Sequence, residues 1–160
     1  MKQILVLSDN DLERHVTEKI LLNGLDEVKI LSAAGTEQAL DILQREKTDL
    51  FIADIPKFNL ARCNMISSVQ KLVPETPILV LSSGEQEHVS RNIWRLGIRD
   101  YLLKPCRPTW IIAAVKSLLG KSAQSPPEEQ PEEKRKERYA NSLAGYLRSF
   151  QYKKCIQTTR

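Results

Sequence analysis

The chain has 160 residues, of which 41% are hydrophobic and 28% are charged, and its formal net charge is +4. This length suits one domain with an appendage, and the composition is that of a globular protein, which excludes wholesale disorder. No apolar run approaches the roughly 20 residues that cross a bilayer, and the apolar run before Ser8 is too short for a signal peptide, so we expect a cytoplasmic protein.

Short apolar runs rich in β-branched residues recur at intervals of about 20 to 25 residues and predict strands. They are almost continuously hydrophobic, without strict alternation, which is typical of parallel strands covered on both faces. The five runs are Ile4–Leu7, Val28–Leu31, Leu50–Ala53, Ile78–Leu81 and Asp100–Leu103.

The first two intervals between these runs predict amphipathic helices. The first helix spans 11–23, and Gly24 follows it as a stop signal. Helical spacing predicts four residues for its buried face: Leu12, Val16, Ile20 and Leu21. Thr36 is a good N-cap residue for the second helix, because its hydroxyl can accept a hydrogen bond from the first turn.

Three further helices follow. The third should end before Pro74, since a proline disfavours helical geometry in the residue before it. A weaker pattern predicts a fourth helix over 85–96. The fifth should begin at Pro108, where the first helical turn tolerates proline, and close at Gly120.

Strict alternation of strand and helix predicts an α/β fold, with a doubly wound five-stranded parallel sheet and helices on both faces. With the flavodoxin-like strand order 2-1-3-4-5, the carboxyl ends of the first and third strands flank the switch point where ligands of such sheets bind. The first strand delivers Asp9 to this point, and the third delivers Asp54.

Polar residues follow the ends of four predicted strands in a specific order. They are Ser8-Asp9 after the first strand, Asp54 at the end of the third, Ser82 after the fourth, and the block Asp-Tyr-Leu-Leu-Lys-Pro at 100–105 on the fifth. This set resembles the receiver domain of response regulators in two-component signalling, the CheY-like family. The resemblance covers 3–119, and the block at 100–105 is its most specific element.

The resemblance implies that Asp54 accepts a phosphoryl group, with Mg²⁺ as cofactor, from a histidine kinase or a phosphotransfer protein. Transfer to a carboxylate needs a cation that shields the phosphoryl oxygens and donors for the developing charge. Asp9, Asp54 and the main-chain carbonyl of Pro56 would be the magnesium ligands, and such hard oxygens suit this ion. Lys104 and Ser82 would bind the phosphoryl oxygens.

Tyr101 is the switch residue that the resemblance implies. When phosphate draws the Ser82 hydroxyl inward, the tyrosine ring would turn toward the core and alter the face made by the fourth helix, fifth strand and fifth helix, where a downstream protein would bind. A plain half-buried strand aromatic is the alternative reading of Tyr101. Such a domain signals and is no enzyme in the usual sense, because it catalyses only its own phosphorylation and dephosphorylation.

Two departures from the family bear on this mechanism. Ser8 stands where the family usually has an acidic residue, so it could act on the metal only through a water, and a lower Mg²⁺ affinity is expected. The loop over 55–64 lacks the usual glycine. These departures leave open a pseudo-receiver that signals without phosphorylation. A flavin-binding enzyme is disfavoured, because Asp9 and Asp11 would repel its phosphate.

The cysteines and histidines lack the spacing of a metal site or a disulfide framework. Cys63, Cys106 and Cys155 are widely separated, and we expect reduced thiols that pack as small hydrophobes. His15 and His88 are expected on the surface.

The net charge is concentrated at the C-terminal end. Residues 1–121, the predicted receiver domain, have a net charge of +1. Residues 122–133 have a net charge of −4 and are rich in proline, which is typical of an extended or flexible linker. Residues 134–160 have a net charge of +7 and the apolar spacing of an amphipathic helical tail.

The role of the tail is left open by its sequence. No DNA-binding motif is recognised in it, and its basic residues are expected to face water more than phosphates. The stretch 143–156 faintly resembles the first helix and turn of a tetratricopeptide repeat, so the tail could begin a C-terminal domain that is truncated here. Alternatively, the tail helix packs on a second copy of the chain and makes a homodimer.

Overall fold

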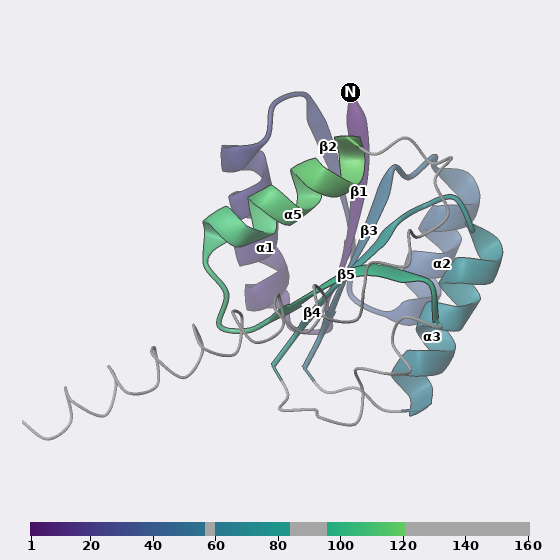
Figure 1. Cartoon of the computed structure of the whole chain (residues 1–160). Coiled ribbons are helices and arrows are strands. Elements are labelled where there is room, and N and C mark those ends of the chain that lie inside the picture. Colours follow the sequence, from purple (N-terminus) through teal and green to yellow (C-terminus); the bar gives the residue numbers. More distant parts are fainter. Residues whose placement is uncertain (57–59, 84–95, 121–160) are drawn as a thin grey trace, which may run out of the picture.

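Strands and helices alternate along the chain (Figure 1). The structure is a computed structural model, and it describes residues 1–56, 60–83 and 96–120. The strands are β1 (Lys2–Leu7), β2 (Val28–Ala33), β3 (Leu50–Ile55), β4 (Ile78–Ser82) and β5 (Ile98–Leu103). The helices are α1 (Asp11–Gly24), α2 (Thr36–Arg45), α3 (Leu60–Leu72) and α5 (Pro108–Gly120).

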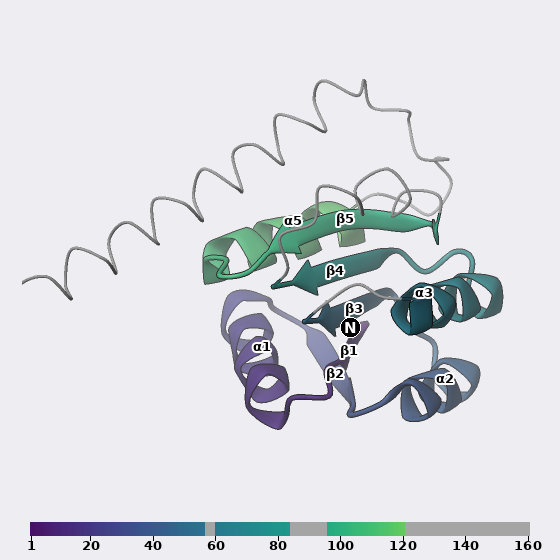
Figure 2. The same ribbon diagram turned by 90° about the horizontal axis from the view of Figure 1, so that it is seen from below.

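The strands form one parallel sheet in the order β2-β1-β3-β4-β5, which confirms the predicted doubly wound fold. Helices α1 and α5 cover one face of this sheet, and α2 and α3 cover the other (Figure 2). Each predicted strand lies within an observed one. As predicted, α3 ends before Pro74 and α5 begins at Pro108.

Each face of the sheet has its own apolar cluster. The central strands β3 and β4 are buried along their whole length, which explains why their sequences do not alternate. The cluster under α1 and α5 includes Ile4, Val6, Leu21, Ile52, Leu81, Ile111 and Val115. The cluster under α2 and α3 includes Leu5, Ala39, Phe51, Ile66, Val69 and Val80.

The predicted buried face of α1 is wrong in part. Leu12 and Val16 are 72% and 48% exposed, whereas Leu21 is buried together with Thr17. At about 100° per residue, Leu12 and Leu21 lie on opposite sides of the helix and cannot both face the sheet. The close approach of α5 selects the Leu21 side, because a Cβ at Gly24 would lie 2.5 Å from Ile112.

The predicted N-cap of α2 is also wrong. Thr36 is the first residue of the helix, and the cap position is Gly35, which makes no side-chain capping bond. Instead, the Gln38 side chain turns back and accepts a hydrogen bond from the backbone N–H of Ala34 at 2.9 Å. This contact binds the backbone just before the cap residue, whereas a threonine cap would have accepted from the first turn of the helix.

Several predictions lie outside the described residues: the fourth helix, the linker over 122–133, the tail over 134–160, His88 and Cys155. Cys63 and Cys106 are free and half-buried, and His15 is exposed, as predicted. Within the described ranges, no helix is long and apolar enough to span a bilayer.

Candidate functional site

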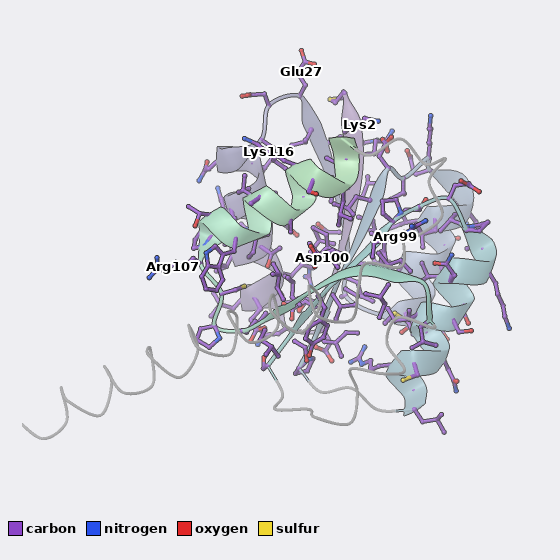
Figure 3. The ribbon with its side chains drawn as sticks, viewed as in Figure 1. Lys2, Glu27, Arg99, Asp100, Arg107 and Lys116 are labelled. Carbon is purple, nitrogen blue, oxygen red and sulfur yellow. The ribbon has the colours of Figure 1, made fainter. Side chains whose placement is uncertain are left out.

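The carboxyl ends of the strands meet at one edge of the sheet, because all strands run in the same direction. Asp9 follows β1, Asp54 lies near the end of β3, Ser82 ends β4, and Lys104 follows β5. The amino ends of the strands lie at the opposite edge, where Lys2 and Glu27 project together (Figure 3). The predicted site residues are therefore gathered at one edge.

Asp54 is the most deeply buried charged residue of this edge, with only 1% of its surface exposed. Its register partner on β4 is Leu81, a member of the cluster under α1 and α5, so the carboxylate faces that side of the sheet. The Lys104 ammonium lies 2.5 Å and 2.6 Å from the two carboxylate oxygens and donates to both. The structure thus brings the predicted phosphoacceptor and the predicted lysine into direct contact.

The backbone after β5 holds Lys104 in this position. Its N–H donates to the carbonyl of Ser82 at 2.7 Å, which extends the pairing of β4 and β5 by one residue. The peptide bond between Lys104 and Pro105 is cis.

Burial and charge act against each other in this pair. Burial raises the pKa of Asp54 above its ordinary value, and the Lys104 ammonium only partly offsets this effect. For Lys104, burial acts to lower the pKa, but hydrogen bonds to Asp54 and Glu13 outweigh it, so the pKa is raised. Lys104 therefore carries its positive charge throughout the physiological pH range.

Glu13 is a second carboxylate on the same lysine. Its Oε2 accepts a hydrogen bond from the Lys104 Nζ at 2.5 Å. Glu13 is the third residue of α1, and the side chain of the N-cap residue Asn10 accepts from the N–H groups of Leu12 and Glu13 at 3.0 Å and 3.2 Å. The start of α1 thus fixes an acidic side chain, 43% exposed, beside the site.

Asp9 is held by an arginine from another element. Its Oδ2 lies 2.6 Å from Nη2 of Arg62, which is the third residue of α3. The Asp9 side chain is 50% exposed and that of Arg62 is 22% exposed. Asp9 thus lies at the predicted edge, but its carboxylate is engaged by a cationic side chain.

The remaining predicted residues differ in how they are engaged. Ser8 is buried, and its hydroxyl bonds to the backbone N–H and carbonyl of Asn10, both at 3.3 Å. Ser82 is fully buried, and its Oγ has no partner within the described part of the chain. Tyr101 is half-buried on the same face as Ser82, against the cluster under α2 and α3. Pro56 follows β3 and is exposed.

The donor set suits a magnesium ion in its chemistry. Mg²⁺ is usually bound through one or two carboxylates while it keeps several waters, and Asp9, Asp54 and the Pro56 carbonyl are hard oxygen donors. Among the described residues, no three acidic, histidine or cysteine side chains converge into a cation site. A site here would therefore rest on two carboxylates, a carbonyl and water.

Sequence reasoning missed Glu13 and Arg62. Glu13 is 91 positions from Lys104, and Arg62 is 53 positions from Asp9, so neither contact has a local signal. A partial clue existed for each: Glu13 stands at the third position after an N-cap asparagine, and Arg62 belongs to the segment 55–64 that departs from the family pattern. The prediction of a loop over all of 55–64 is wrong, because α3 already begins at Leu60.

The family model described as response regulator receiver domain matches residues 4–116. Over 106 residues the chain is 30% identical to "Regulator of RpoS" of Escherichia coli (strain K12), a match that covers 66% of this chain and 31% of that protein. Over 130 residues it is 31% identical to "Alkaline phosphatase synthesis transcriptional regulatory protein PhoP" of Bacillus subtilis (strain 168), with coverage of 79% and 52%. The chain thus spans about a third to a half of these relatives.

Solved structures share the fold. A response regulator from Thermotoga maritima superposes with a TM-score of 0.67 at 24% identity, covering 76% of this chain and 99% of that chain. The chemotaxis protein CheY4 of Vibrio cholerae gives a TM-score of 0.65 at 20% identity, with coverage of 74% and 98%.

Proposed function

Because the chain belongs to the response regulator receiver domain family, we propose that it is a phosphoacceptor switch in which Asp54 receives the phosphoryl group. The observation that carries this proposal is the buried Asp54 carboxylate, bound through both oxygens to Lys104 at the switch point of the sheet. Buried, charge-paired groups with shifted pKa values are frequent at functional sites.

The proposed reaction is a phosphoryl transfer from the phosphohistidine of a histidine kinase or phosphotransfer protein. A carboxylate oxygen of Asp54 forms a bond to phosphorus while the bond from phosphorus to the histidine nitrogen breaks, and the departing imidazole takes up a proton. Lys104 then moves from the carboxylate to the phosphoryl oxygens, with which an ammonium makes strong charge-assisted hydrogen bonds. The Ser82 hydroxyl, which has no partner in the described part of the chain, supplies a further donor.

Asp9, Asp54 and the Pro56 carbonyl are the proposed ligands of Mg²⁺, and Ser8 would act only through a metal-bound water. When bound, the ion would neutralise charge on the phosphoryl oxygens. The Ser8 hydroxyl already bonds to the Asn10 backbone, which supports a minor role for it.

The proposed output passes through Tyr101. Ser82 and Tyr101 lie on the same face of the sheet, on neighbouring strands. Movement of the Ser82 hydroxyl toward a phosphoryl group would change the space next to the half-buried ring and shift the population of its conformations. A downstream protein, or a second copy of the chain, would recognise the altered face that includes β5 and α5.

A pseudo-receiver that signals without phosphorylation is the second candidate function. The Asp9 carboxylate, which a cation needs, is bound to Arg62 at 2.6 Å, and this favours the second candidate. The two candidates make different predictions about Asp54, so one experiment separates them.

Intact-mass spectrometry after incubation with Mg²⁺ and acetyl phosphate tests the proposal. Wild type should gain one phosphoryl group, and Asp54→Asn should gain none. Asp49→Asn is the matched control, because Asp49 lies just before the other end of β3, paired with Lys2, and this variant should gain as much phosphoryl as wild type. A wild type as unmodified as Asp54→Asn would refute the switch and leave the pseudo-receiver.

A further inference from the structure

Each carboxylate of the site has a resident cation. Lys104 binds Asp54 and Glu13, and Arg62 binds Asp9. The site thus combines three carboxylates with two side-chain cations. The two cations belong to different elements, because Lys104 follows β5 and Arg62 lies in the first turn of α3. In this arrangement Asp9 is already neutralised before any metal ion arrives.

An arginine in this place cannot be removed by a change of protonation. The guanidinium keeps its charge at every pH that a folded protein meets. A divalent cation bound to Asp9 would stand within a few ångströms of this group, and like charges at such a distance repel. The contact between Asp9 and Arg62 therefore opposes cation binding at Asp9.

The neighbouring residues increase the effect that Arg62 has on cation binding, because they leave Asp9 as the most available carboxylate. Ser8 brings no negative charge, and its hydroxyl is turned to the Asn10 backbone. The Asp54 carboxylate is shared with Lys104, and Glu13 is bound to the same ammonium. Asp9 is thus the carboxylate of the site that is half-exposed to water and does not contact Lys104. Its partner is Arg62.

We infer that Arg62 is an internal competitor of the divalent cation and sets the affinity of the site for that ion. This inference rests on the proposed use of Mg²⁺ at this edge. The contact is partly exposed and therefore weak, so a divalent cation can displace it, and its loss would free the first turn of α3. Cation binding would thereby reach α3 before any phosphoryl group is present.

Calorimetric titration of the full chain with MgCl₂, without any phosphodonor, tests this inference. Arg62→Gln keeps much of the side-chain length but removes the charge, and it should tighten Mg²⁺ binding by roughly two- to fivefold. Arg62→Lys keeps the charge and should stay within about twofold of wild type. Arg45→Gln is the matched control, because Arg45 pairs with Asp41 on α2, and its affinity should equal that of wild type.

Three outcomes overturn the inference. An unchanged affinity in Arg62→Gln removes it while leaving the proposed phosphorylation of Asp54 in place. An equal gain in Mg²⁺ affinity in Arg62→Gln and Arg45→Gln would show that the effect comes from the net charge of the protein and not from the contact with Asp9. Absence of binding in every variant removes the inference and the metal requirement together. Asp9→Asn should abolish Mg²⁺ binding both in wild type and in Arg62→Gln. Circular dichroism of each variant shows whether it is folded.

Discussion

One aspartate precedes strand β3 and another lies near its end, and their pKa values are shifted in opposite directions. Asp49 precedes the strand and accepts hydrogen bonds from the Gln3 backbone N–H at 2.9 Å and the Lys2 ammonium at 3.0 Å. Burial acts to raise the pKa of Asp49, but these partners outweigh it, so the pKa is lowered. At the other end, burial raises the pKa of Asp54 despite its contact with Lys104.

The difference separates a stabilising carboxylate from a functional one. A lowered pKa means that folding favours the ionised form, so Asp49 adds stability at neutral pH. A raised pKa means that folding disfavours the ionised form, so ionised Asp54 subtracts stability there. At the amino edge of the sheet the ionised Asp49 stabilises the folded protein, whereas at the carboxyl edge the ionised Asp54 lowers the free energy of unfolding.

The largest expected effect comes from removing the lysine of the carboxyl edge. Lys104→Met leaves two carboxylates near a buried position without their cation, and we expect the free energy of unfolding at pH 7 to fall by roughly 2–4 kcal/mol. Urea denaturation measures this. The double variant Lys104→Met/Asp54→Asn should recover part of the loss, and equal losses in both proteins would contradict the account.

Asp49→Asn should lower the free energy of unfolding by about 1 kcal/mol at pH 7, because it weakens charged hydrogen bonds to Lys2 and Gln3. The contribution of Asp49 is fully present above its unfolded pKa of about 3.9 and is lost as the pH falls through the lowered folded pKa. Denaturation curves at pH 7 and near pH 2.5 check this. If the free energies of unfolding of Asp49→Asn and wild type differ as much in acid as at pH 7, the ionised form of Asp49 is not the source of the stability.

Asp54→Asn should not lower the free energy of unfolding as Asp49→Asn does. It removes a buried carboxylate whose ionised form folding disfavours, while Lys104 keeps its contact with Glu13. We expect the free energy of unfolding at pH 7 to stay constant or rise by up to about 1 kcal/mol. Thermal denaturation beside Asp49→Asn gives the comparison, and a loss larger than that of Asp49→Asn would reverse the assignment of the two edges.

The smallest expected effect concerns Glu13. Its carboxylate shares Lys104 with Asp54 and would repel an incoming anionic phosphodonor. Glu13→Gln should accelerate phosphorylation by acetyl phosphate about two- to fivefold, the range of a partly exposed charge pair. Glu46→Gln, which removes the same charge from the contact with Lys29, is the control. Equal rates in the two variants would show that Glu13 has no particular role.

The strands and their burial could be predicted because their signals are local. Buried parallel strands have continuous apolar sequences, and their alternation with helices predicts a doubly wound parallel sheet. The strand order itself came from the resemblance to the receiver family. The same topology gathers Asp9, Asp54, Ser82 and Lys104 at one edge without any knowledge of side-chain contacts. The roles of these residues in phosphorylation stay predictions.

The orientation of α1 and the partners of Asp9 and Lys104 could not be predicted. The burial of Leu21 in place of Leu12 depends on the close approach of α5 at Gly24. The contact between Arg62 and Asp9 joins the first turn of α3 to the segment between β1 and α1, and these two parts of the chain are far apart in the sequence. Such contacts depend on how elements pack, and a single sequence gives at most a partial clue to them.

Beryllofluoride, an analogue of a phosphoryl group on a carboxylate, tests the central claim most directly. Amide chemical shifts of the labelled chain are recorded with Mg²⁺ before and after its addition. We predict large changes for Asp54, Ser82 and Lys104, none for Lys2 and Asp49, and no response in Asp54→Asn. Unchanged spectra, or equal changes in wild type and Asp54→Asn, would contradict a phosphoacceptor at the carboxyl end of β3.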